Sequence, residues 1–240
     1  RRKFFYSEKI NGILVHRSWI YTNNSRGKIF RLLNYFSFVL TSILKGLSLK
    51  SFDYIYCESP PLFISYSAFT IAWFRKSKVI FNVSDLWPES VKELKIITNK
   101  FLLSLASRLE SKSYNKSYLV TGQTKGIIES INSRFPHVRT HWFPNGVDID
   151  IFNNINPDSS FRVNYGLEGK KIFMYAGIFG YAQGLDVIIK AAKQLEDQKD
   201  IKFVMVGDGP LKEELMNLNS NLQTNVLFIP NTEKEILLRW

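Results

Sequence analysis

Hydrophobic and polar residues follow one another along this chain in blocks typical of alternating strands and helices. The clearest block covers residues 171–210. In it, residues 172–175 and 203–206 are short apolar runs, the pattern of buried parallel strands. Between these runs, apolar residues recur at spacings of three and four and so predict one face of a helix: Leu185, Ile188, Ile189, Ala192 and Leu195. The block therefore predicts a right-handed strand–helix–strand unit whose loops meet at the carboxyl edge of a parallel sheet.

The same alternation extends over most of the chain. Apolar runs predict strands at 10–20, 53–57, 78–83, 117–120 and 225–229, and periodic segments predict helices at 28–49, 99–113 and 123–133. Pro210 is expected at the first position of a helix, and Thr232 to Glu235 has the spacing of a capping box. Strands alternating with helices predict an α/β protein with doubly wound parallel sheets.

The pattern changes after Trp142, and an Asn-rich stretch follows at 153–158. We therefore expect a first Rossmann-like domain at 1–144, a connection at 145–170 and a second Rossmann-like domain at 171–240. Both domains are expected to be incomplete at the ends of the chain.

Charge divides the chain unevenly. Residues 1–145 hold 22 Lys or Arg against 8 Asp or Glu, whereas residues 146–240 hold 10 against 13. A positive first half indicates an anionic partner, which could be nucleic acid, lipid headgroups or a phosphate-bearing acceptor, or a basic surface without any partner. The helix at 28–49 carries Lys28, Arg31 and Lys45, so it could lie on a membrane surface or pack on a sheet.

Several classes of protein are excluded. The one cysteine, Cys57, cannot form an intrachain disulfide and favours a reducing compartment. The longest uncharged stretch, residues 59–74, is short and contains two prolines, so it does not predict a membrane span. Three histidines and one cysteine make a zinc site untenable, and no Walker, dinucleotide-binding, hydrolase or nucleic-acid motif is present.

Glycines mark the loop after the strand at 172–175. Gly177, Gly180 and Gly184 have no side chains, so the backbone amides between them and the next helix could approach a phosphate. The alternative is that these glycines only turn the chain.

Three motifs, in order, carry a family resemblance: Asn-Gly-Val-Asp at 145–148, the glycine loop and helix at 175–192, and Val-Gly-Asp-Gly-Pro at 206–210. Together they resemble the donor-binding half of retaining GT-B glycosyltransferases of family 4, also called glycosyltransferase group 1. The segment at 83–90 resembles a subgroup that transfers sugars such as N-acetyl-L-fucosamine in surface polysaccharide synthesis. The resemblance implies a GT-B fold with the donor on the second domain and the acceptor on the first.

Asp85 is expected in a loop at a strand's carboxyl end, where it could be catalytic by orienting or deprotonating an acceptor hydroxyl, or could merely cap the next turn. The resemblance also implies roles for other residues, and it places Asn145 and Gly146 between the domains. Relatives place a Lys where this chain has Gln183, so a cation from elsewhere or the helix terminus would have to stabilise the leaving diphosphate. Asp208 could equally cap a helix. The expected donor-binding residues are Gly177, Phe179, Gly180, Gln183, Gly184, Asp208, Gly209 and Pro210, and the expected acceptor-binding residues are Glu58, Ser59, Ser84 and Trp87.

The resemblance finally predicts the reaction: transfer of a sugar from a nucleotide sugar, UDP-linked, to a lipid-linked or polysaccharide acceptor, with retention and without a metal or cofactor. The expected location is the cytoplasmic face of a cell membrane, on which the basic first domain would bind anionic lipid. Nucleic acid is not an expected partner. The alternatives are a non-catalytic module that binds sugar nucleotides or polysaccharide, and a basic protein that binds nucleic acid.

Overall fold

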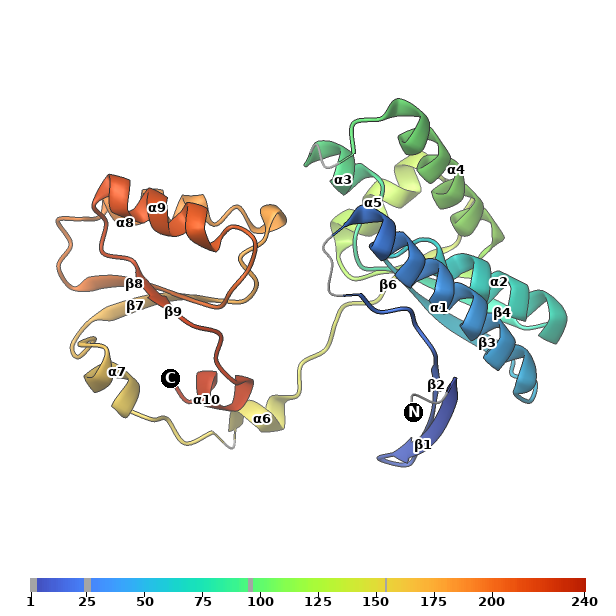
Figure 1. The fold of residues 1–240 in the computed structure, drawn as a ribbon, viewed down its shortest axis with the longest axis horizontal. Coiled ribbons are helices and arrows are strands. Elements are labelled where there is room, and N and C mark those ends of the chain that lie inside the picture. The colour runs from blue at the N-terminus through green and yellow to red at the C-terminus, as the bar shows by residue number, and fades with distance from the viewer. Residues whose placement is uncertain (1–3, 24–26, 95–96, 154) are drawn as a thin grey trace. The chain divides into compact units, whose positions relative to one another are not determined.

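A computed structural model describes residues 4–23, 27–94, 97–153 and 155–240. The chain folds into two compact units, Arg1–Gly146 and Val147–Trp240 (Figure 1). Each unit has its own parallel sheet and its own hydrophobic core.

The first unit begins with a hairpin of β1 (Phe5–Ile10) and β2 (Ile13–Ser18). Asn11 and Gly12 form its two-residue turn, for which Asn-Gly is the favoured pair. The sequence predicted a strand after a turn at 10–20, and the Asn-Gly turn followed by β2 confirms it. The sequence missed β1, the strand that precedes this turn and pairs with β2.

A parallel four-stranded sheet follows, in the order β3 (Tyr54–Ser59), β4 (Lys78–Val83), β5 (Leu119–Gly122) and β6 (Thr140–Trp142). The helices of this unit are α1 (Lys28–Ser48), α2 (Ile64–Arg75), α3 (Glu89–Glu93), α4 (Lys100–Lys116) and α5 (Lys125–Arg134). The predicted strand at 78–83 is confirmed, and the predicted helices at 28–49, 99–113 and 123–133 are confirmed within three residues at each end.

One face of this sheet carries the core of the first unit. Cys57, Phe81 and Val120 project from it and pack against α2, α4 and α5. On α4, Leu109 reaches this core, but Leu102 and Leu105 are exposed. The predicted apolar face of this helix therefore packs only towards its carboxyl-terminal half.

An ion pair between a buried carboxylate and a partly exposed guanidinium joins α4 to α5. Arg134 donates to both carboxylate oxygens of Glu110, at 3.0 and 2.8 Å, and Glu110 is only 2 % exposed. The two bonds compensate the charge of Glu110, which the core would otherwise leave unpaired.

The second unit contains a three-stranded parallel sheet of β7 (Lys171–Ala176), β8 (Ile201–Val206) and β9 (Leu227–Ile229). Figure 1 shows α8 (Asp186–Gln194) and α9 (Lys212–Leu222) on one face, with α7 (Ser160–Asn164) and α10 (Lys234–Leu237) on the other. Met205 packs towards the first pair of helices, and Val204 and Val206 pack towards the second.

The expected connection at 145–170 contains α6 (Ile149–Asn153) and α7. Phe161 and Leu167 from this segment are buried against the second sheet. The chain divides between Gly146 and Val147.

Two predicted helix starts are corrected. Helix α9 begins at Lys212, so Pro210 lies in the turn before it and not at its first position. The predicted capping box does not form, because Glu233 caps α10 without a side-chain bond and Thr232 donates instead to the carbonyl of Pro230, at 3.0 Å.

Candidate functional site

Two glycine turns lie side by side at the carboxyl ends of β7 and β8. The Gly177 amide donates to the carbonyl of Val206 at 3.0 Å, and the Phe179 amide donates to the carbonyl of Asp208 at 2.9 Å. The Leu211 amide then donates back to the carbonyl of Phe179 at 3.0 Å. These bonds make the two turns one rigid layer at the edge of the sheet.

Gly207 and Gly209 are required by this close approach. Both have positive φ, 145° and 159°. A Cβ at Gly207 would overlap the carbonyl of Gly177, and a Cβ at Gly209 would lie 2.5 Å from the carbonyl oxygen of Phe179. Any side chain at either position would therefore push the two turns apart.

The expected phosphate loop continues from Gly177 through a short turn of 3-10 helix, Tyr181–Gln183, to α8. A Cβ at Gly180 would meet the Oε1 atom of Gln183 at 2.6 Å and the Cγ2 atom of Ile178 at 3.9 Å, and a Cβ at Gly184 would meet nothing within 4 Å. Gln183 and Gly184 are exposed, so this part of the loop is open to a ligand.

The first turn of α8 has no side-chain cap. Asp186 lies in it, and Lys190 donates to its carboxylate at 2.6 Å. The bond from Lys190 is the main cause of a lowered pKa of Asp186. Lys190 thereby offsets the negative charge of Asp186 next to the expected phosphate loop.

Phe179 does not present its side chain to a ligand. Its ring is 0 % exposed and packs with Leu185 and Ile189 in the core of the second unit. A contact of this residue with a donor would have to use its backbone, whose amide and carbonyl already bond to the neighbouring turn. The structure thus gives Phe179 a packing role that the sequence pattern did not reveal.

Asp208 holds the second turn from its exposed position. Its Oδ1 atom accepts from the Gly209 amide at 2.7 Å, and Lys212 donates to its Oδ2 atom at 3.1 Å. The bond from Gly209, followed by the bond from Lys212, lowers the pKa of Asp208. The helix-cap alternative does not hold for α9, since the cap residue of that helix is Leu211. Pro210 is exposed beside it.

A second group of polar side chains gathers at the carboxyl ends of β3, β4 and β5. The Asn82 amide nitrogen donates to Glu58 Oε2 at 2.7 Å, and Ser84 Oγ donates to Glu58 Oε1. Gln123 donates to Ser84 Oγ at 2.5 Å, and Thr121 donates to Asn82 Oδ1 at 2.6 Å. The sequence indicated Glu58 and Ser84 but missed Asn82, Thr121 and Gln123, which only the register of the strands brings to them.

The other expected residues of the first unit lie around this group. Asp85 is exposed, and its carboxylate accepts from Ser90 Oγ at 3.1 Å. Ser59 is fully buried, and its hydroxyl has no partner among the described residues. The Trp87 ring packs on the core beside Phe63, with 6.4 Å between ring centroids.

Asn145 and Gly146 are exposed at the end of the first unit. A Cβ at Gly146 would meet nothing within 4 Å. The expectation that they serve the region between domains stays a prediction.

The charge of Glu58 reaches two neighbours on β3. Burial, and then the nearby Glu58 carboxylate, raises the pKa of Cys57 to about 12. The same two causes, in the same order, raise the pKa of Tyr56. Both groups are therefore protonated at neutral pH, and Cys57 has no thiolate character.

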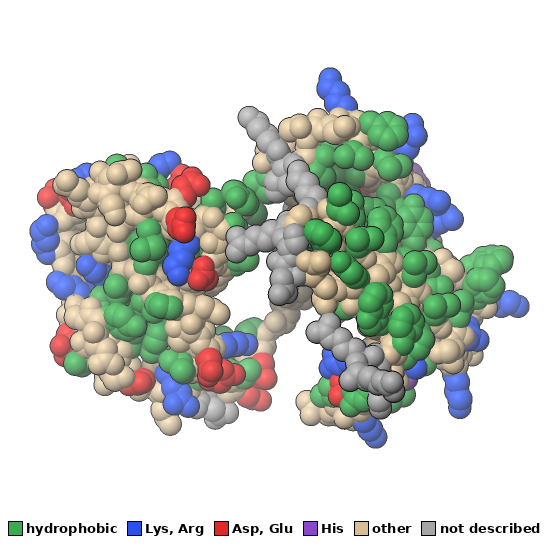
Figure 2. Space-filling model, in the orientation of Figure 1, with side chains coloured by type: hydrophobic (Ala, Val, Ile, Leu, Met, Phe, Trp, Pro, Cys, Tyr) green, Lys and Arg blue, Asp and Glu red, His purple; other side chains and the backbone are tan. Residues whose placement is uncertain are grey.

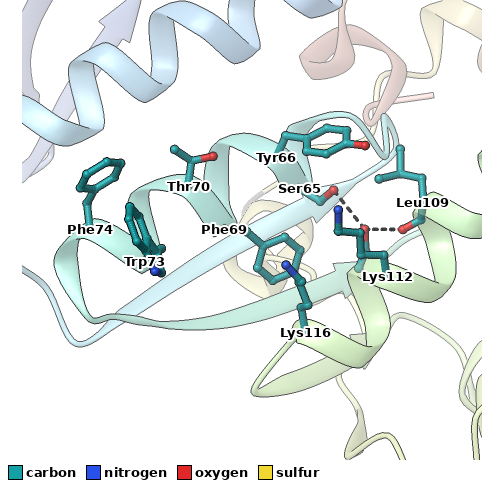
Figure 3. A pocket seen from close by; sticks show the side chains of 10 residues that line it. Ser65, Tyr66, Phe69, Thr70, Trp73, Phe74, Leu109, Lys112 and Lys116 are labelled. Atoms are coloured by element: carbon teal, nitrogen blue, oxygen red, sulfur yellow. Dashed lines mark hydrogen bonds between the residues drawn. The ribbon is translucent and has the colours of Figure 1, made fainter.

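A groove of about 340 Å³ lies between α2 and α4 (Figure 3). Tyr66, Phe69 and Trp73 line it from α2, while Lys112 and Lys116 line it from α4. Trp73 is 75 % exposed, and Lys112 lies 5.9 Å from the centroid of the Tyr66 ring. The groove thus combines exposed aromatic surface with positive charge.

Helix α1 buries some of its polar side chains and exposes many of its apolar ones. Asn34 donates to the carbonyl of Tyr21 at 2.7 Å, and Thr41 donates to the carbonyl of Trp19 at 2.6 Å. Figure 2 shows hydrophobic side chains gathered over the first unit. Those exposed on α1 are Ile29, Leu32, Leu33, Tyr35, Phe36, Leu40 and Leu44.

The described residues contain neither a metal-binding cluster nor a membrane-spanning helix. In residues 4–23, 27–94, 97–153 and 155–240, no three His, Cys, Asp or Glu side chains are placed to hold a metal ion. Over the same ranges, no helix has the length and apolar character needed to cross a membrane.

The comparisons with known proteins concern the fold and the second unit. Residues 158–239 match the family described as glycosyl transferases group 1. The matched segment includes both glycine turns. No curated protein matches the chain.

Solved structures match both units together. HepE of Anabaena in complex with UDP has a TM-score of 0.59 at 17 % identity, over 83 % of this chain and 53 % of its own. Sucrose-phosphate synthase of Thermosynechococcus elongatus has a TM-score of 0.67 at 14 % identity, over 91 % and 54 %. The pneumococcal O-GlcNAc transferase GtfA, in complex with UDP and GlcNAc, has a TM-score of 0.56 at 15 % identity, over 98 % and 48 %.

The predicted α/β architecture is confirmed by these matches: the chain has the GT-B fold. It spans about half the length of each of these three structures.

Proposed function

We propose that this chain is part of a glycosyltransferase that moves a sugar from a UDP-linked nucleotide sugar to a lipid-linked or polysaccharide acceptor. The observation that carries the proposal is the match of residues 158–239 to glycosyl transferases group 1, because that segment contains both glycine turns. HepE and GtfA, which share the fold, were solved with UDP bound. The finer assignment is to the subgroup that transfers N-acetyl-L-fucosamine and similar sugars.

The donor diphosphate would lie at the open part of the loop, along Gln183 and Gly184 and next to the buried Gly180. Backbone donors fixed in place can stabilise the charge that develops on a leaving diphosphate without a metal. The two glycine turns, which are joined by backbone hydrogen bonds, supply such a rigid frame. We therefore propose a metal-independent reaction, and retention of the anomeric configuration follows from the resemblance to retaining enzymes.

The acceptor would lie on the first unit, at the carboxyl ends of β3 and β4, where open α/β sheets bind ligands. Glu58, Ser59, Ser84 and Trp87 are the proposed acceptor-binding residues. Asp85 is the proposed catalytic residue, because its exposed carboxylate could orient or deprotonate an acceptor hydroxyl.

The membrane is proposed as the place of reaction. The positive charge of residues 1–145 supports attraction to anionic lipid on the cytoplasmic face, and the exposed apolar side chains of α1 support contact with its interface.

Calorimetry with UDP in the presence of EDTA tests the donor site. We expect the chain to bind UDP and the Gly180→Val variant to bind it at least about tenfold more weakly, since a side chain beside Gln183 blocks backbone approach. Gly126→Val is the matched control, because Gly126 lies on α5 with only Thr124 Oγ1 within 4.0 Å.

Equal binding by Gly180→Val and the parent chain would show that the phosphate loop is misplaced. If the parent chain binds DNA in a salt-sensitive way and has no affinity for UDP, the transferase proposal itself falls.

A further inference from the structure

The register of the first sheet places four polar side chains in one line. Glu58 pairs with Asn82, Asn82 with Thr121, and Thr121 with His141, one residue on each strand. Since neighbouring strands lie about 4.8 Å apart, this polar row is about 14 Å long. Successive residues of a strand point to opposite faces, and the polar row lies on the face opposite the core residues Phe81 and Val120.

The two hydrogen bonds that join Thr121, Asn82 and Glu58 both run towards Glu58. Thr121 donates to Asn82 Oδ1 at 2.6 Å, which leaves the Asn82 amide nitrogen to donate to Glu58 Oε2 at 2.7 Å. Asn82 and Thr121 are only 3 % and 4 % exposed, whereas Glu58 is exposed. The buried pair therefore holds the carboxylate in one orientation at the surface.

A second arm holds the other oxygen of the same carboxylate. Gln123 donates to Ser84 Oγ at 2.5 Å, and Ser84 Oγ donates to Glu58 Oε1. Each oxygen of Glu58 thus accepts one bond from the protein and keeps a lone pair for another donor. Among the described residues, no Lys, Arg or His forms an ion pair with Glu58.

This chemistry selects a neutral ligand rich in hydroxyl groups. A fixed carboxylate accepts strong hydrogen bonds from hydroxyls, and two oxygens side by side suit two neighbouring hydroxyls of a sugar ring. A phosphate or diphosphate would be repelled by the negative charge of Glu58. Because Asn82 and Thr121 are buried, the ligand contacts the row at its exposed end, Glu58.

We propose that the polar row is the subsite for the acceptor saccharide, an inference that rests on the function proposed above. Glu58 binds two hydroxyls of the sugar, and Asn82, Thr121 and Ser84 are positioning residues that orient its carboxylate. The phosphate part of a lipid-linked acceptor lies away from Glu58.

Saturation-transfer NMR on the 240-residue chain tests this subsite. The probes are the methyl glycosides of glucose, galactose and N-acetylglucosamine. We expect at least one glycoside to bind, and Glu58→Gln to weaken its binding about tenfold, as expected for the loss of hydrogen bonds to a charged group. Glu129→Gln, on exposed α5, is the matched control and should bind as the parent chain does.

A pair of variants at Thr121 separates positioning from general destabilisation. Thr121→Val removes the hydroxyl that fixes the Asn82 amide, so glycoside binding should fall about as far as it does in Glu58→Gln. Thr121→Ser keeps the hydroxyl and should restore binding. Both variants should have the same affinity for UDP as the parent chain.

The outcomes distinguish this subsite from the proposed function. If the chain binds UDP but none of the glycosides, or if Glu58→Gln binds them as the parent does, the subsite is refuted. If Thr121→Ser fails to restore binding while Thr121→Val folds normally, the positioning role is refuted. If the chain binds a glycoside but not UDP, the saccharide site is supported and the proposed transferase function is refuted.

Discussion

Gly209 decides the shape of the loops at the edge of the second sheet. Its missing side chain lets the backbone of Phe179 approach within the space that a Cβ would fill. The sequence marked this glycine as part of a motif, but its physical reason is a contact with a residue 30 positions earlier in the chain.

The first prediction concerns this contact. Gly209→Ala should lower the free energy of unfolding of the second unit by at least about 2 kcal/mol, since both the positive φ and the backbone overlap oppose a methyl group. Urea unfolding followed by circular dichroism measures the change.

Gly184→Ala is the control for that prediction. Gly184 has a φ of 58° but open space around it, so an added Cβ costs only about 1 kcal/mol. If Gly184→Ala and Gly209→Ala lower the free energy of unfolding equally, the close approach of the Phe179 backbone to Gly209 contributes nothing to the cost.

Cys57 supplies a prediction for alkaline pH. Its thiol has a pKa of about 12 in the folded chain, raised by burial and then by Glu58. In the unfolded chain the thiol ionises near pH 9, so between pH 9 and about 12 only the folded state keeps the proton. The free energy of unfolding should therefore fall by about 1.4 kcal/mol per pH unit from this group.

Cys57→Ala tests the assignment, because it removes this contribution and should make the dependence on pH shallower over the same range. Unfolding in urea at a series of pH values gives both curves. If the free energy of unfolding falls equally steeply with pH in the parent chain and in Cys57→Ala, another group causes the loss of stability at alkaline pH.

At the scale of elements, α4 and α5 are joined by charge as well as by apolar packing. The pairing of Glu110 with Arg134 crosses 24 positions of sequence and lies at the edge of the core. The hydrophobic pattern of the two helices does not predict this ion pair, because Glu110 has the sequence context of an ordinary exposed polar residue on a helix.

Arg134→Met should lower the free energy of unfolding of the first unit by about 3–5 kcal/mol, since Glu110 would keep a buried charge without its donors. Adding Glu110→Gln should recover part of the loss, because the uncompensated charge disappears. A double variant no more stable than Arg134→Met alone would contradict this explanation, and thermal unfolding measures all three.

The elements themselves follow closely from the hydrophobic pattern. Helix α1 and strand β4 were predicted within one residue, because a long periodic run and an apolar run are both strong local signals. Strand β1 and the start of α9 were missed, since strand pairing and turn geometry depend on contacts that the pattern does not contain.

At the scale of the molecule, charge and exposed apolar surface coincide on the first unit. Residues 1–145 carry the excess of Lys and Arg, and α1 and the groove of α2 and α4 expose apolar and aromatic side chains. The positive charge alone, or the exposed apolar surface alone, is compatible with a surface that contacts only solvent. Together they support the proposed contact with an anionic membrane.

Vesicle sedimentation tests that contact. The chain should bind vesicles of phosphatidylglycerol more strongly than vesicles of phosphatidylcholine. Raising the salt from about 0.1 to about 0.5 M should weaken binding, as the screening length falls from about 10 to about 4 Å.

The double variant Lys112→Glu, Lys116→Glu should bind phosphatidylglycerol vesicles more weakly than the parent chain does. Lys199→Glu, on the second unit, should change vesicle binding little. Binding that is indifferent to lipid charge, salt and these substitutions would exclude the membrane role.

The sequence alone determined the α/β alternation, the order of most strands and helices, and the glycine motifs that resemble a glycosyltransferase. These features are local, because each depends on neighbouring residues in the chain. The tertiary structure decided that Phe179 is a core residue and that Glu58, Asn82, Thr121 and His141 lie in one row. Those facts depend on strand register and on backbone contacts between distant segments, which no local pattern specifies.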